Sequence, residues 1–181
     1  HDALPILAVV REKEIGTIEQ VIVTPIRKYE FIVGKTLPFV LIGYANVFLI
    51  SLVGGLVFRV PVRGSLFLLI LATGLFLMSS LGTGLFLSTI SQTQQQAKMS
   101  AFFIIFIAMF LSGFAFPVEN MPQSVQWLTL INPVRWFMEI IRGLYLKGVG
   151  LVILWKQFAM LLLIGAVVLG SAVARFRKTV G

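Results

Sequence analysis

The first residues whose types and spacing could do chemistry are Gly34, Lys35 and Thr36. They match the end of the G-x-x-x-x-G-K-[ST] loop, in which backbone amides and a lysine hold nucleotide phosphates. The first glycine of that loop would stand at Tyr29, and the loop must open a soluble helix. Here the 23 residues that follow Lys35 carry no charge. The three residues therefore indicate the water-facing start of a membrane helix rather than a nucleotide site.

Cysteine and histidine, on which much protein chemistry depends, are nearly absent. The chain has no cysteine, and its one histidine is His1. Disulfides, thiolate metal sites, cysteine nucleophiles and the H-E-x-x-H metalloprotease arrangement are therefore excluded. Apart from Asp2, four acids precede residue 31 and only Glu119 and Glu139 come later, so no carboxylate pair is expected at mid-membrane. We expect neither an enzyme nor a metal or cofactor bound by this chain.

The composition is typical of a polytopic membrane protein. Of the 181 residues, 58% are apolar and only 12% are charged, and the mean hydropathy is +0.98. A soluble domain of this length needs more polar surface than that. The net charge is +8, but the basic residues stand at the ends of apolar runs, where they anchor helices against anionic lipid. The expected partner is therefore membrane lipid and not nucleic acid.

Four segments are long and apolar enough to cross a membrane as helices. A helix needs about 20 apolar residues to cross roughly 30 Å of hydrocarbon, and no charged residue lies at the centre of any segment. The predicted fold class is all-α, with four transmembrane helices. They cover residues 36–58, with Pro38 in the first turn, and residues 65–90, 99–116 and 151–174. The polar residues 91–99 are expected to form a turn between two spans.

The distribution of lysine and arginine indicates the orientation, because cytoplasmic segments carry the excess of these residues. With the N-terminal segment inside, nine basic residues lie on the inner side and six on the outer side. Both ends of the chain are therefore expected in the cytoplasm. The inner residues are Arg11, Lys13, Arg27, Lys28, Lys35, Lys98, Arg175, Arg177 and Lys178, and the outer residues are Arg59, Arg63, Arg135, Arg142, Lys147 and Lys156.

Small residues recur at helical spacing in two of the spans. Such residues on one face of a helix let membrane helices approach closely. We expect them to pack within the chain rather than against a second subunit. We also expect Asn46, in the first span, to form an interhelix hydrogen bond rather than to contact a substrate. The small residues are Ser80, Gly84 and Ser88 in the second span and Ala166, Gly170 and Ala174 in the fourth.

Residues 11–35 are neither a span nor a simple loop. Ile15, Ile18 and Ile22 fall on one face of a helix, and charged residues cover much of the rest. Thr24 and Pro25 can end this helix and cap the next. The pattern predicts a cytoplasmic amphipathic helix that leads directly into the first span. The helix either rests on lipid or docks on a protein. Its acidic residues would face an anionic leaflet, which favours the protein.

Residues 117–150 are too apolar for a solvated loop and too broken by prolines to span a membrane. Two short helices fit, at about residues 124–131 and 134–147, with a turn at Asn132 and Pro133. This pattern predicts an outer helical hairpin that re-enters the membrane. Backbone that is not helical is tolerated at that depth only against protein or a watery cavity. The hairpin is therefore either an outer gate or a lid with no role in transport.

Charges recur along the second of these helices. Arg135, Glu139 and Arg142 follow one another at i, i+4 and i+7 with alternating sign, which favours ion pairs on one face. The candidate residues of the outer gate are Pro117, Glu119, Pro122, Asn132, Pro133, Arg135, Glu139 and Arg142.

Several short motifs follow one another over nearly the whole chain. They are R-E-K-E-x-G-T-x-E-Q-x-x-V-T-P at residues 11–25, G-K at 34–35, VPVRG at 60–64, S-x-T-Q-Q-Q-A at 91–97, SGFAFPVENMP at 112–122, INP at 131–133 and RG at 142–143. In this order they resemble the membrane subunits of ABC-2 type transporters, and most closely the drug-exporter-like branch. The resemblance depends on the order of the motifs rather than on any single one.

The resemblance implies one ABC-2 type transmembrane domain over residues 1–181, in the bacterial inner membrane. It implies a permease subunit of an ATP-driven exporter, in which ATP and Mg²⁺ bind to a separate ATPase subunit. The pathway would form between two permease subunits, which we expect to be identical. In that family a subunit has six spans and a large external domain after the first. Because the sequence starts at His1 and matches only the later part, we expect it to be a piece of a longer chain.

The resemblance also implies that residues 11–25 are the coupling helix that docks on the ATPase. The residues that match the motif are Arg11, Glu12, Gly16, Thr17, Glu19, Thr24 and Pro25. The alternative, which composition and topology alone allow, is a channel-like or scaffolding four-span protein that works without ATP.

Overall fold

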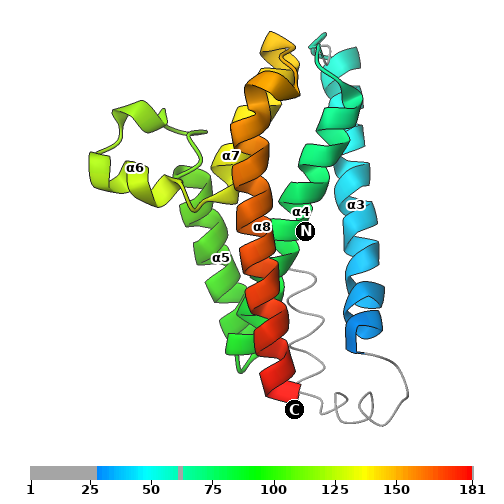
Figure 1. The fold of residues 1–181 in the computed structure, drawn as a ribbon, viewed down its shortest axis with the longest axis vertical. Helices are drawn as coiled ribbons and strands as arrows, with labels where there is room; N and C mark the ends of the chain where they lie inside the picture. Colours follow the sequence, from blue (N-terminus) through cyan, green and yellow to red (C-terminus); the bar gives the residue numbers. More distant parts are fainter. Residues whose placement is uncertain (1–27, 61–62, 181) are drawn as a thin grey trace.

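The structure is a computed structural model that describes residues 28–60 and 63–180, and the structural statements below concern these residues. Within them the chain is helical and has no strand. Four long helices stand side by side, and short helices gather near one end of the molecule (Figure 1). The prediction of an all-α fold is confirmed for this part of the chain.

The long helices differ in their capacity to cross a membrane. Three contain apolar stretches of sufficient length, at Val33–Leu56, Leu66–Ile90 and Leu151–Arg175. The fourth, α5, has 17 residues and is about 25 Å long at about 1.5 Å per residue, which is short for a hydrocarbon core of roughly 30 Å. The structure thus has three candidate spans where the sequence predicted four. The four helices are α3 (Lys28–Leu56), α4 (Leu66–Ile90), α5 (Gln94–Phe110) and α8 (Leu151–Val180).

Helix α3 begins at Lys28, well before residue 36, where the sequence predicted its start. Glu30 lies in the first turn, where the helix dipole favours a negative charge. Pro38 therefore lies inside the helix, and its predicted position in the first turn is wrong. The tripeptide from Gly34 to Thr36 is helical as well, so it forms no phosphate-binding loop.

The turn between α4 and α5 is shorter than the predicted segment 91–99. It consists of residues 91–93, and the hydroxyl of Thr93 caps α5 by accepting a hydrogen bond from the Gln96 nitrogen at 3.2 Å. The glutamines expected in the turn therefore form the start of α5. This helix also ends before the predicted residue 116, at Phe110, and Gly113 then adopts a left-handed conformation with φ of 79°.

Helices α4 and α8 run in the same direction and pack along their length (Figure 1). A Cβ atom at Gly82 would lie 2.8 Å from the Leu169 nitrogen, and one at Gly165 would lie 2.9 Å from the Ser79 hydroxyl. The two backbones therefore touch where glycine permits it, as in other membrane helix pairs. We call this contact the α4–α8 interface.

The small residues of α8 that face α4 are not the predicted ones. Gly165 and Ala172 are buried, whereas Ala166, Gly170 and Ala174 are exposed. The predicted packing of these three within the chain is wrong for the described structure. On α4, Gly84 and Ser88 are buried and Ser80 is half-buried, so the stripe on that helix does pack within the chain. Gly165 and Ala172 are seven positions apart and share one helix face, and Ala166 lies about 100° around the helix from Gly165.

The main core lies at the end of the molecule where α4 and α8 begin, which we call the hairpin end. There the short helix α7 (Pro133–Arg142) packs against both α4 and α8. The buried side chains are Leu68, Leu69 and Ala72 of α4, Trp136 and Ile140 of α7, Leu144 just beyond it, and Leu154, Phe158 and Leu161 of α8. The hairpin is therefore part of the packed core.

Helix α3 lies at the edge and packs on α4. Leu77 fills the space beside Gly43, and the Tyr44 hydroxyl donates to the Ile70 carbonyl at 3.1 Å. Asn46 forms no hydrogen bond to another described residue, so the interhelix bond expected of it is absent there. Tyr44, two residues earlier, makes the polar contact between the helices instead.

Candidate functional site: the helical hairpin

The sequence predicted two functional regions, and the structure describes one of them. The candidate coupling residues are Arg11, Glu12, Gly16, Thr17, Glu19, Thr24 and Pro25, and they lie outside the described residues. The hairpin is fully described. It consists of a short 3-10 turn (Val118–Asn120), α6 (Gln123–Thr129), α7 and a π-helical turn (Gly143–Lys147).

Local residue chemistry sets the ends of the hairpin helices. Pro122 precedes α6, and the side chain of Asn132 caps α7 by accepting a hydrogen bond from the Val134 nitrogen at 3.1 Å. Pro133 occupies the first position of α7, where its fixed φ suits a helix and its missing N–H is not needed. The helix break thus lies at Asn132 and Pro133, where the sequence predicted the turn.

Asn132 also connects the hairpin to α5. Its side-chain nitrogen donates to the Ala108 carbonyl at 2.7 Å, near the end of α5, and the residue is only 6% exposed. One side chain therefore fixes both the start of α7 and its distance from α5. A buried amide with both ends satisfied gives a specific geometry, since any displacement leaves a polar group without a partner.

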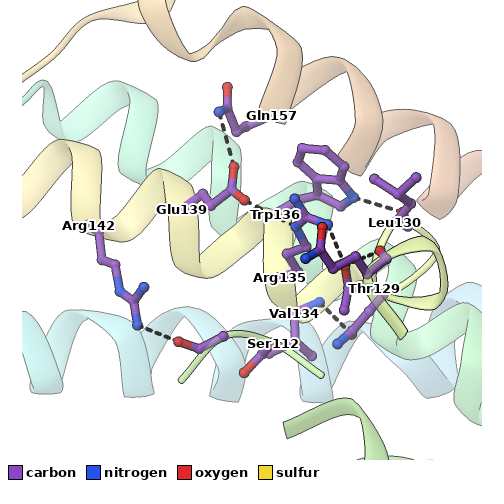
Figure 2. A network of polar contacts seen from close by, with 12 residues as sticks. Ser112, Thr129, Leu130, Val134, Arg135, Trp136, Glu139, Arg142 and Gln157 are labelled. Carbon is purple, nitrogen blue, oxygen red and sulfur yellow. Dashed lines mark hydrogen bonds and ion pairs between the residues drawn. The ribbon is translucent and has the colours of Figure 1, made fainter. Parts of the chain in front are cut away.

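The charged residues of α7 form a network that joins three helices (Figure 2). The guanidinium of Arg135 lies 3.2 Å from the Glu139 carboxylate, and it also donates to the Thr129 hydroxyl at the end of α6. The other oxygen of Glu139 accepts a hydrogen bond of 3.1 Å from Gln157 of α8. Ionisable residues among apolar helices are costly unless they are paired. The network therefore holds α6, α7 and α8 in one arrangement.

Arg142 departs from the predicted arrangement. It donates to the Gly113 carbonyl at 2.9 Å, in the segment that follows α5 (Figure 2). The alternating stack of three charges is therefore realised only for Arg135 and Glu139. Arg142 and Asn132 both hold the segment at the end of α5 against α7, one at each end of α7.

The remaining predicted gate residues lie away from this network. Pro117 precedes the 3-10 turn, Glu119 lies in it, and Pro122 precedes α6; all three are exposed. The Glu119 backbone carbonyl, at 3.5 Å, and the Met121 carbonyl, at 2.9 Å, accept from the Gln126 side chain. These residues shape the entry to α6, whereas Asn132, Pro133, Arg135, Glu139 and Arg142 fix α7.

Sequence reasoning missed several partners. Gln157 follows Lys156, and these two are the polar residues between Leu151 and Gly170 of α8, so the position of Gln157 could have been noticed in the sequence. The contact between the hydroxyls of Ser51 in α3 and Tyr145 in the π-helical turn has no such signal, since 94 positions separate them. Ser51 also donates to the Val47 carbonyl at 2.7 Å. This contact connects α3 to the hairpin.

The polar contacts of α7 fix the positions of the hairpin helices. Among the described residues, no group of His, Cys, Asp or Glu could hold a metal ion. The polar side chains pair with one another or with carbonyl groups, so they fix positions. The fold and this site define a multi-pass helical membrane protein with a polar-bonded helical hairpin at one end.

Comparison with known proteins then gives the family. The sequence model of the ABC-2 type transporter matches residues 4–146, and the chain belongs to this family. It is 37% identical over 174 residues to the probable multidrug ABC transporter permease YbhR of Escherichia coli strain K12, and 34% identical over 176 residues to the inner membrane transport permease YhhJ of that strain. Each alignment covers 96% of this chain and 47% of the relative, so the chain spans about half the length of these curated relatives.

A further relative, the probable multidrug ABC transporter permease YbhS of the same strain, is 35% identical over 143 residues, which is 78% of this chain and 38% of the relative. No solved structure matches the chain. The chain is thus classed with membrane transport subunits rather than with enzymes.

Proposed function

We propose that the chain is part of a permease subunit in an ATP-driven ABC exporter of the bacterial inner membrane. It forms the translocation pathway together with a second, identical permease subunit, and ATP and Mg²⁺ bind to a separate ATPase subunit. The observation that carries the proposal is the family match over residues 4–146, which includes the predicted coupling helix and nearly all of the hairpin. The names of two relatives make drugs the first substrates to test.

Topology supports a fourth crossing by α5. Helices α4 and α8 run in the same direction, so the chain must return between the end of α4 and the start of α8. Helix α5 is the only long helix between them, and α7 continues in the same direction toward the hairpin end (Figure 1). We therefore propose four spans, with the hairpin re-entering the outer leaflet and both ends of the chain in the cytoplasm.

The exposed side chains of the hairpin support its place in lipid. Trp127, Leu128 and Ile131 are large, apolar and exposed on or just after α6, which projects away from the other helices (Figure 1). Apolar side chains in such a position favour a hydrocarbon environment. The charged network on α7 faces protein instead, as required of non-helical backbone and ionisable groups at membrane depth.

The coupling mechanism that we propose runs through α3. Closure of the ATPase pair moves the helix at residues 11–25, and α3, which follows it, transmits the movement along the membrane. The uninterrupted course of α3 from Lys28 to Leu56 supports a rigid connection. The contact between Ser51 and Tyr145 passes the movement to the hairpin, and the hairpin opens and closes the outer side.

A pull-down of the tagged protein from detergent-solubilised membranes tests this function, with ATPase activity assayed on the eluate. We expect a soluble ATPase to co-elute and to be lost when Gly16→Leu and Glu19→Ala are combined. Glu119→Ala is the control, since it removes an acid that lies on the outer side in the proposed topology. A folded protein with no ATPase bound would support a channel-like or scaffolding protein instead.

A further inference from the structure

Four cations gather at the hairpin end without an acidic partner. Arg59, Arg63, Lys147 and Lys156 are exposed, and none forms an ion pair with another described residue. The hairpin carries two acids: Glu139, which pairs with Arg135, and Glu119, which lies in the 3-10 turn before α6. In the proposed topology these cations lie outside, where the usual distribution of basic residues disfavours them. We therefore expect an anion that is not part of the described chain to bind these four cations.

Backbone contacts hold two of the cation-bearing segments together. The Gly64 nitrogen donates to the Leu144 carbonyl at 2.8 Å, so the segment before α4 is bonded to the π-helical turn. Gly148 has φ of 61°, and a Cβ atom there would lie 3.0 Å from the Cβ of Arg63. This close approach places the ends of the two segments, which carry Arg63 and Lys147, side by side.

The backbone is also irregular at two of these positions. Arg59 has φ of 53°, a conformation that residues with a Cβ rarely adopt and that marks a constrained site. Lys147 is the last residue of a π-helical turn, a form that is rare and occurs frequently at functional sites. Two cations are thus presented by uncommon backbone geometry at the same end of the molecule.

Each of three cations follows a large, exposed apolar residue. Phe58 is 71% exposed and precedes Arg59, Leu146 is 61% exposed and precedes Lys147, and Trp155 is 64% exposed and precedes Lys156. The pattern recurs on three separate elements. A soluble anion needs only the cations, whereas a phospholipid offers a phosphate for the cation and acyl chains for the apolar neighbour.

We propose that this cationic rim, defined as Arg59, Arg63, Lys147 and Lys156, binds the headgroup of an anionic phospholipid. The guanidinium and ammonium groups bind the phosphate, and Phe58, Leu146 and Trp155 lie against the acyl chains. Because Arg63 and Lys147 belong to segments joined by a backbone hydrogen bond, one headgroup bridges the α3–α4 connection and the hairpin. The inference goes beyond the proposed transport function, and its test needs neither nucleotide nor ATPase.

The test is native mass spectrometry of the purified protein titrated with short-chain phosphatidylglycerol, and with phosphatidylcholine of the same chain length. We expect the wild type to bind phosphatidylglycerol in preference. The double variant R63Q/K147Q should bind it roughly 30-fold more weakly, because each cation near an anionic headgroup contributes about a fivefold gain. The matched control is K98Q/R175Q, which removes the same charge at the other end and should change the affinity less than about twofold.

Three results would overturn the proposal. They are equal binding of the two lipids to the wild type, unchanged affinity of R63Q/K147Q for phosphatidylglycerol, and full competition by inorganic phosphate, which would indicate a site for soluble anions. The melting temperature in phosphatidylcholine shows whether R63Q/K147Q is folded. If it is not, the single variant K156Q takes its place, with an expected loss of about fivefold.

Discussion

The α4–α8 interface and the joint between the hairpin and its neighbours hold the molecule together by different means. In the α4–α8 interface two backbones touch through Gly82 and Gly165, and the Ser79 hydroxyl beside Gly165 donates to the Leu75 carbonyl of its own helix. In the hairpin joint, which we define as the polar contacts of Asn132, Arg135, Glu139 and Arg142, separate hydrogen bonds connect α7 to α5, α6 and α8. A side chain added at Gly82 would separate α4 from α8 along the interface, because the two backbones touch there. The polar contacts of the hairpin joint can be removed one at a time by substitution.

The largest effect should come from filling the α4–α8 interface. Gly82→Leu places a side chain where even a Cβ atom would lie 2.8 Å from the Leu169 backbone, so the helices must separate. We expect a loss of about 3 kcal/mol in the free energy of unfolding. The measurement is the melting temperature in detergent. Gly170→Leu is the control, since nothing lies within 4 Å of that position, and it should change little. Equal losses of stability for Gly82→Leu and Gly170→Leu would show that the close α4–α8 contact at Gly82 is not what stabilises the fold.

A smaller loss should follow from Asn132→Ala. The change removes both the cap of α7 and the bond to the Ala108 carbonyl, so we expect a loss of about 2 kcal/mol by the same measurement. Asn132→Ser separates the two contributions, because serine can cap the helix but has no amide group to donate to the Ala108 carbonyl. It should recover about half of the loss. Equal losses for Asn132→Ser and Asn132→Ala would show that the cap contributes nothing.

Glu139→Gln should destabilise the joint by about 1 kcal/mol, because it leaves the Arg135 guanidinium without its carboxylate partner. The double variant R135Q/E139Q removes both charges and should be less damaging than the sum of the two single changes. Thermal unfolding of the wild type, R135Q, E139Q and R135Q/E139Q gives the interaction energy between the two residues. Strict additivity would show that the ion pair contributes no interaction of its own.

The smallest effect on stability should come from Tyr145→Phe, at about 0.6 kcal/mol, since it removes one hydroxyl contact with Ser51. Tyr44→Phe is the matched control, because it removes the hydroxyl contact between α3 and α4. We expect the two variants to be equally stable. Only Tyr145→Phe should lower the efflux of a fluorescent drug per ATP hydrolysed in proteoliposomes. An equal fall in both variants would assign the contact a purely structural role.

Local chemistry was predictable from the sequence, and distant contacts were not. The break at Asn132 and Pro133 depends on residues that cap and start a helix, so it could be placed without a structure. The start of α3 was missed because hydropathy marks the membrane-embedded part of a helix, whereas Lys28 and Glu30 extend the same helix in a polar stretch.

The contacts of Arg142 and of α8 show more clearly what could not be predicted from the sequence. Spacing along α7 favoured an ion pair for Arg142, but a carbonyl 29 positions away competes for the same guanidinium, and only the folded chain brings it near. On α8 small residues lie on two faces, one with Gly165 and Ala172 and the other with Ala166, Gly170 and Ala174. The sequence does not say which of them meets α4, because lipid and protein neighbours are both apolar.

The short length of α5 has a mechanical consequence. At 17 residues it is about 8 residues, or roughly 12 Å, shorter than the apolar stretch of α4. In the proposed four-span topology, a bilayer that fits α4 and α8 is too thick beside α5, and each ångström of such mismatch costs a fraction of a kcal/mol, of order 0.1 to 0.5. The protein therefore has a thin side and a thick side. The free energy of any rearrangement on the thin side, where α5 meets the hairpin, therefore depends on the thickness of the bilayer.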